Sequence, residues 1–133
     1  MAPCALGRKH RYVFTNAATR GAPFLNAIQV LDLATGTSTT RAFGPAAFAG
    51  EPIVVPRRAA GRDRRTRRLA DEEDGGDEVD AYLLTHVYDS DAHSTDVVCL
   101  DARTLEEVFR IELGVPVPYS FHGAFVEGEE RKK

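Results

Sequence analysis

Residues 81–113, AYLLTHVYDSDAHSTDVVCLDARTLEEVFRIEL, decide the fold of this chain. They contain three runs rich in β-branched and aromatic residues, at 81–88, 96–101 and 107–113, separated by short polar segments. Such runs predict β-strands joined by hairpins. Further runs of the same kind predict strands at 11–15, 26–33, 37–43 and 51–56. The sequence therefore indicates an all-β fold.

The composition bounds the classes of function. The chain has 133 residues, 28% of them charged, and a formal net charge of −3 at pH 7. This length suits one domain, and the charge balance favours neither nucleic acid nor a membrane surface as a partner. No apolar run approaches the roughly 20 residues that span a bilayer. Two cysteines, Cys4 and Cys99, are too few for a disulfide framework, which points to a reducing compartment.

Changes in composition divide the chain into segments. We expect a frayed N-terminus over residues 1–10, a β-rich domain over 11–126 and a charged tail over 127–133. Within the domain, residues 57–80 carry a block of arginines followed by a block of acids, without apolar periodicity, which predicts a solvated loop insertion. The arginine block could act as a binding arm, but pairing with the acids that follow it is the simpler interpretation.

An internal repeat suggests how the strands are grouped. Residues 30–44 are similar to residues 99–114: each has Leu-Asp, a short turn with threonine, a second strand and a glycine. Without the charged insertion, the offset between them falls to roughly the 40–50 residues of one propeller blade. Two such units cannot close a ring. The chain is thus predicted to be either a small two-sheet domain or a piece of a larger protein.

The candidate chemical residues are four histidines: His10, His86, His93 and His122. The first and third lie in polar surroundings and are expected at the surface, and the acidic loop around His93 could bind a divalent cation only loosely. His86 lies in the middle of a predicted strand, which favours a packing role. His122 is the strongest candidate for a metal ligand, because prolines restrict the chain before it and Gly123 allows close backbone contact after it.

Three motifs stand out when the chain is considered as a whole. They are GEPIVVP at 50–56, the acidic EDGG at 73–76 with a strand and an LDARTL hairpin at 100–105 after it, and VPYSFHGAF at 117–125. In this order and spacing, over residues 11–126, they resemble the C-terminal part of the carotenoid cleavage oxygenases. That family includes the retinal pigment epithelium isomerohydrolase.

The resemblance implies a fold and a metal site. The family fold is a seven-bladed β-propeller with Fe(II) on its axis, held by four histidines, and this chain would supply about two terminal blades and the closing strand. His122 matches the last of these histidines, and Glu51 matches a glutamate that hydrogen-bonds a ligating histidine. A carboxylate in that role fixes the tautomer and the orientation of the imidazole. Two departures, Ser120 in place of glycine and Val55 in place of a larger residue, are expected to be tolerated.

The resemblance also implies an activity. The family's reaction is the oxidative cleavage, by dioxygen, of a conjugated C=C bond in a carotenoid or apocarotenoid, which gives two carbonyl products. The other three ligands, the substrate tunnel and a peripheral membrane contact would lie outside these residues, so we expect a C-terminal fragment that is inactive alone. The alternative is a non-catalytic β-domain, a pseudoenzyme or partner-binding module that keeps only the terminal blades.

The expected partners are the carotenoid or apocarotenoid substrate and dioxygen, without nucleic acid. The compartment is left open: a soluble intracellular protein, in the cytoplasm or, in a photosynthetic eukaryote, in the plastid.

Overall fold

The computed structural model of the chain describes residues 10–57, 78–118 and 123–126. Over these ranges the chain forms two antiparallel sheets and no helix. The first sheet has the order β1-β2-β3, with β1 at Tyr12–Ala17, β2 at Ala27–Asp32 and β3 at Thr37–Ala42. The second has the order β4-β6-β7-β8, and β5 also pairs with β6. Its strands are β4 (Ala47–Ala49), β5 (Ile53–Pro56), β6 (Ala81–Asp89), β7 (Ser94–Asp101) and β8 (Glu107–Glu112).

The all-β prediction is confirmed, and every run predicted as a strand contains one. The sequence did not predict β4, because its three residues follow the Gly-Pro pair at 44–45, which reads as a strand breaker. The described parts of the C-terminal stretch, 113–118 and 123–126, form no strand. The charged tail predicted at 127–133 lies outside the described residues, as do most of the predicted N-terminal segment 1–10 and most of the charged insertion 57–80.

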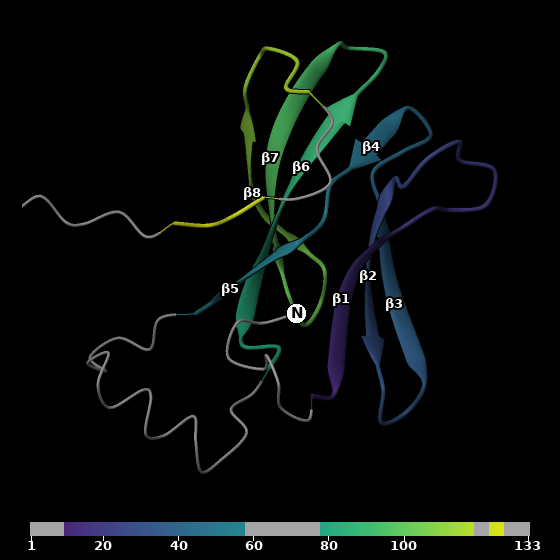
Figure 1. The fold of residues 1–133 in the computed structure, drawn as a ribbon, viewed down its shortest axis with the longest axis vertical. Coiled ribbons are helices and arrows are strands. Elements are labelled where there is room, and N and C mark those ends of the chain that lie inside the picture. Colours follow the sequence, from purple (N-terminus) through teal and green to yellow (C-terminus); the bar gives the residue numbers. More distant parts are fainter. Residues whose placement is uncertain (1–9, 58–77, 119–122, 127–133) are drawn as a thin grey trace, which may run out of the picture.

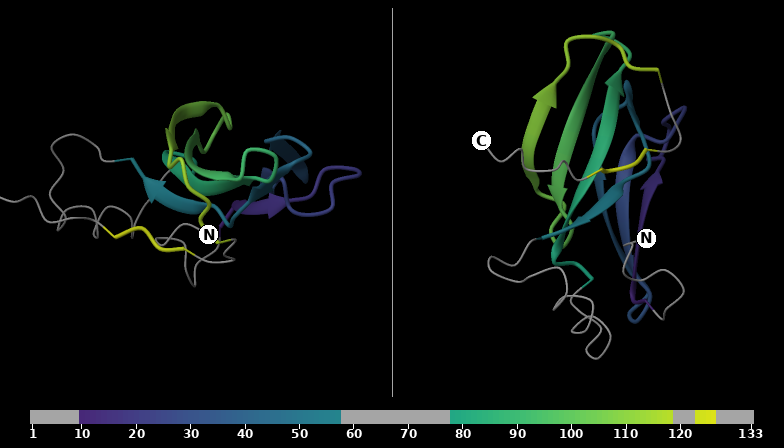
Figure 2. Two further views of the ribbon diagram at one scale, coloured as in Figure 1. Left: turned by 90° about the horizontal axis from the view of Figure 1, so that it is seen from above. Right: turned by 60° about the vertical axis from the view of Figure 1, so that its left-hand side comes forward.

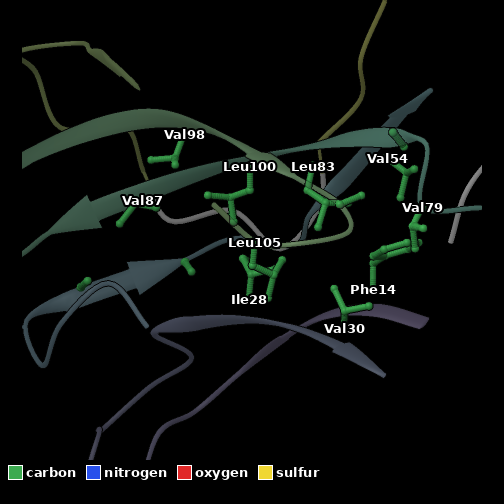
Figure 3. Close-up of a cluster of buried hydrophobic side chains, with 14 residues drawn as sticks. Phe14, Ile28, Val30, Val54, Val79, Leu83, Val87, Val98, Leu100 and Leu105 are labelled. Carbon is green, nitrogen blue, oxygen red and sulfur yellow. The ribbon is translucent and has the colours of Figure 1, made fainter. Parts of the chain in front are cut away.

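The two sheets pack against each other (Figures 1 and 2), and Figure 3 shows buried side chains from both sheets between them. Strand β6 alternates between buried and half-buried residues, with Leu83 on the face toward the first sheet. In Figure 3, Leu83 and Leu100 of the second sheet point toward Ile28 of the first, and all three are fully buried. This apolar layer is the core of the chain, because it contains the cluster of buried apolar side chains from both sheets.

The internal repeat corresponds to two hairpins, β2–β3 and β7–β8, which turn in the same way. The aspartate of each Leu-Asp pair caps its turn: Asp32 Oδ1 accepts the N–H of Ala34 at 2.9 Å, and Asp101 Oδ1 accepts the N–H of Arg103 at 2.8 Å. The fourth residue after each aspartate is left-handed, Gly36 with φ 70° and Leu105 with φ 59°. The sequence repeat is therefore a repeat of turn geometry.

The turn aspartate of each hairpin also belongs to the same kind of cluster, with an arginine and a tyrosine from outside the repeat. The two clusters are Arg11, Tyr12 and Asp32, and Arg57, Tyr82 and Asp101. In both, the tyrosine pairs with the aspartate across the strands, and the guanidinium lies over the ring and bonds the carboxylate. In the first cluster the guanidinium holds the pKa of the aspartate well below its usual range. These clusters close corresponding ends of the two sheets.

Leu105 takes the left-handed turn position that glycine, Gly36, takes in the other repeat. Its left-handed backbone is uncommon for a residue with a Cβ and costs about 1 kcal/mol. Its side chain is 3% exposed and lies between Leu100 and Ile28 in the core (Figure 3). Burial of the leucine offsets the backbone strain.

We therefore expect Leu105→Ala to lower the free energy of unfolding by about 2–4 kcal/mol, because it leaves a cavity and retains the strain. Chemical denaturation followed by far-UV circular dichroism measures the change. The matched control is Leu33→Ala at the other hairpin, where the side chain is 50% exposed. Equal losses in the two variants would contradict a core role for Leu105.

An ion-pair network joins the two sheets at β8. Arg110 bonds Glu107 at 2.9 Å and Asp96 at 2.7 Å, and Arg41 of β3 approaches Glu107 at 3.5 Å. Hydrogen bonding from Arg110 holds the pKa of Glu107 below its ordinary value. The ionised carboxylate therefore stabilises the folded chain.

A carboxylate with a lowered pKa stabilises the fold above its unfolded pKa, about 4.3 for glutamate, and loses that contribution as the pH falls through its folded pKa. We expect Glu107→Gln to be less stable than the unmodified chain at pH 7, and the difference to shrink as the pH falls below about 4.3. Urea denaturation at pH 7 and pH 3 measures both differences. A difference that is the same at both pH values would show that the charge of Glu107 contributes nothing.

Candidate functional site

The GEPIVVP motif forms a β-bulge between β4 and β5. Three residues, 50–52, lie opposite only two residues of β6, 85–86, so the edge of the sheet carries one extra residue. The flanking pairs are Ala49–Val87 and Ile53–Leu84. Bulges bend the strand and redirect a side chain, and they are frequent beside active sites. Glu51, the carboxylate singled out by the sequence, lies within this bulge and is exposed.

The peptide before Glu51 is held on both sides. The N–H of Gly50 donates to the carbonyl of His86 at 2.9 Å. The hydroxyl of Thr85 donates to the carbonyl of Gly50 at 2.9 Å, and Thr85 is 3% exposed. After Glu51, Pro52 is buried and restricts Glu51 to an extended backbone. Together these contacts fix the backbone from which the Glu51 side chain extends.

The ring of His86 covers Gly50. A Cβ at Gly50 would lie 2.1 Å from Cε1 of His86 and 2.5 Å from its Nδ1, so the imidazole occupies the place of a side chain. The packing role predicted for His86 is therefore observed. The sequence could not identify Gly50 as the contact of Thr85 and His86, because strand register is set by tertiary pairing.

The C-terminal segment crosses the face of the second sheet that carries His86. Val117 donates its N–H to Oγ1 of Thr95 at 2.9 Å, and the N–H of Thr95 donates to the carbonyl of Val115 at 3.1 Å. Farther along, a Cβ at Gly123 would lie 3.1 Å from Cδ1 of Ile53. The yellow segment 123–126 accordingly runs beside β5 (Figure 2).

His122 itself lies outside the described residues. Its neighbour Gly123 contacts Ile53, two residues after Glu51. The GEPIVVP and VPYSFHGAF motifs, which are about 70 residues apart in the chain, are therefore adjacent in the fold.

A complete metal centre is not formed by the part of the chain that the structure describes. No group of three or more histidine, cysteine, aspartate or glutamate residues there could hold a metal ion. In the acidic loop, Asp89 Oδ1 accepts the N–H groups of Asp91 and Ala92, and His93 Nδ1 lies 3.2 Å from the hydroxyl of Tyr88. These polar atoms form a hairpin turn. A metal centre at the bulge would need ligands from elsewhere.

The cysteine in the described ranges is unsuited to nucleophilic chemistry. Cys99 is 1% exposed, as its apolar sequence context predicted, and burial raises the pKa of its thiol. A thiol with a raised pKa carries little thiolate at neutral pH. Over the ranges that the structure describes, no helix is long and apolar enough to cross a membrane.

The hydroxyl of Thr85 is expected to stabilise the bulge. Thr85→Val keeps the shape of the side chain but leaves the buried carbonyl of Gly50 without this donor, which costs about 1–3 kcal/mol. Thr85→Ser keeps the donor and is the matched control. Thermal and urea denaturation of the two variants measure the difference, and a valine variant as stable as the serine variant would contradict the assignment.

Comparison with known proteins places these motifs in context. The sequence model of a family described as retinal pigment epithelial membrane protein matches residues 1–127. The chain is 38% identical over 130 residues to apocarotenoid-15,15'-oxygenase of Synechocystis sp., covering 94% of this chain and 23% of that protein. It is 35% identical over 135 residues to the chloroplastic 9-cis-epoxycarotenoid dioxygenase NCED1 of Oryza sativa, covering 96% of this chain and 19% of that protein.

Solved structures agree with these sequence matches. The crystal structure of cobalt-substituted Synechocystis ACO superposes with a TM-score of 0.75 at 34% identity, covering 93% of this chain and 24% of that chain. An ACO/RPE65 chimera superposes with the same TM-score, 0.75, at 32% identity. The chain thus spans about a quarter or less of the length of these relatives, and its two sheets match a part of their β-propeller.

Proposed function

The chain belongs to the carotenoid cleavage oxygenase family, described as retinal pigment epithelial membrane protein, and on this premise we propose that it forms part of an iron-dependent dioxygenase. His122 serves as one histidine ligand of the iron, and Glu51 hydrogen-bonds a ligating histidine. The observation that carries the proposal is the contact of Gly123 with Ile53, which brings the chain next to His122 close to the bulge that holds Glu51.

The chemistry of this donor set supports iron. Neutral imidazoles suit Fe(II) and leave coordination positions open for other ligands. A carboxylate that accepts the free N–H of a ligating imidazole fixes its tautomer and raises its basicity. Iron, when bound, supplies the redox chemistry of dioxygen, while the residues of this chain hold and orient the ligands.

The reaction is the cleavage of one conjugated C=C bond of a carotenoid or apocarotenoid. The double bond breaks, each of its carbons gains one atom of the same dioxygen molecule, and two carbonyl products result. The atoms and electrons balance without an added reductant. The substrate class is supported by the relatives, which are named as apocarotenoid and epoxycarotenoid oxygenases.

The remaining ligands come from protein outside these 133 residues. With His122 as the one iron ligand that it supplies, the isolated chain binds iron weakly and is inactive. In the same proposal residues 11–126 form one domain, into which the charged segment 57–80 is inserted. In a photosynthetic eukaryote the protein works in the plastid, in line with the chloroplastic relatives.

The test uses the complete polypeptide that the source organism produces. His122→Ala is expected to lose bound iron and apocarotenal cleavage, and Glu51→Gln to weaken iron binding by about 10–100-fold. His93→Ala, in the hairpin turn, is the control and is expected to behave as the unmodified protein. Iron is measured by atomic absorption and cleavage by product chromatography. Full iron content in His122→Ala would overturn the proposal and favour a partner-binding β-domain.

A further inference from the structure

We propose that His86 is a positioning residue for Glu51 and acts through Gly50; this inference rests on the proposed function. Glu51 can support a metal ligand only if its carboxylate is held in one place, because outer partners of a metal site work through orientation. The bulge supplies two hydrogen bonds to Gly50 and the restriction from Pro52. The imidazole of His86 supplies a further contact with Gly50.

The absence of a side chain at Gly50 has a steric cause. The turn glycines Gly21, Gly36, Gly44 and Gly114 have positive φ values between 67° and 121°, and a Cβ on any of them would meet open space. Glycine is needed at those positions for its backbone conformation. Gly50 has no left-handed φ, and its Cβ would instead lie 2.1 Å from the His86 ring. Glycine at position 50 is therefore matched to the imidazole.

The close contact between Gly50 and His86 restricts the motion of the bulge. The ring of His86 lies over the Cα of Gly50 on one side, while the hydroxyl of Thr85 holds the Gly50 carbonyl. The peptide that this carbonyl belongs to leads directly to Glu51. If the ring is removed, the peptide gains room to rotate, and the Glu51 carboxylate loses its fixed direction. If a methyl group is added at Gly50, the ring and the bulge must separate.

His86 also lies on the face that leads to the C-terminal motif. Tyr88, two residues along β6, shares this face and pairs with Thr95, whose hydroxyl accepts the N–H of Val117. Leu84, two residues in the other direction, pairs with Ile53, which contacts Gly123. His86 is therefore placed between the two contacts of the segment that contains His122.

The experiment compares His86→Ala with His86→Phe in the complete polypeptide that the source organism produces. Phenylalanine keeps a flat ring over Gly50, whereas alanine leaves a gap. The readouts are the Co(II) absorption spectrum of the cobalt-loaded protein, the rate of metal loss to a chelator and the unfolding temperature. We expect His86→Ala to lose metal about tenfold faster with an altered spectrum, and His86→Phe to stay close to the unmodified protein.

A second pair of variants tests whether the His86 ring is the reason that position 50 requires glycine. Gly50→Ala is expected to lose metal at least as fast as His86→Ala, and Gly50→Ala/His86→Ala is expected to recover part of that loss, since the methyl group then has space. Additive effects in the double variant, or metal loss from His86→Ala at the unmodified rate, would overturn the inference. Should Gly50→Ala fail to fold, the two His86 variants decide the question alone.

The outcomes separate this inference from the proposed function. If His122→Ala and Glu51→Gln keep their metal, the proposed function fails. If those two variants lose metal while His86→Ala retains it with an unchanged spectrum, only the role of His86 fails. His93→Ala is again the control, because its ring contacts the hydroxyl of Tyr88 in a surface turn.

Discussion

Burial of apolar side chains between two twisted sheets is the constraint on which the rest of this structure depends. Ile28, Leu83 and Leu100 meet at the centre of that layer and are fully buried. Each sheet by itself would leave these apolar side chains in water. Packing face to face fixes which side of β6 points inward, and so assigns Leu83 to the core and His86 to the opposite face. The site face is thus a consequence of core packing.

The bulge between β4 and β5 places the carboxylate of Glu51 at the edge of the second sheet. One extra residue between β4 and β5 prevents Glu51 from taking a regular place in the ladder. The irregular backbone needs a hydrogen-bond donor for the Gly50 carbonyl, and the hydroxyl of Thr85 provides it. A backbone held this firmly beside an exposed carboxylate suits a supporting role, in which the side chain must have both a fixed direction and a negative charge.

The two hairpins show how a repeat can keep its geometry while its sequence changes. Asp32 and Asp101 cap equivalent turns, and each is bonded by an arginine that lies over a tyrosine. At the left-handed position one repeat has Gly36, which needs no compensation, and the other has Leu105, whose strain is offset by burial in the core. The same turn is therefore reached by two physical routes.

The sequence by itself predicted the strands and the two-hairpin repeat, because alternation and turn residues are local properties of the chain. Its local context also made His122 a candidate ligand, whereas Glu51 became a candidate only through the resemblance of its motif to the family. The sequence could not determine β4, which is too short for a periodic pattern. Nor could it pair Gly50 with His86 or bring Gly123 against Ile53. Those contacts depend on strand register and on the path of distant segments, which only burial between the sheets decides.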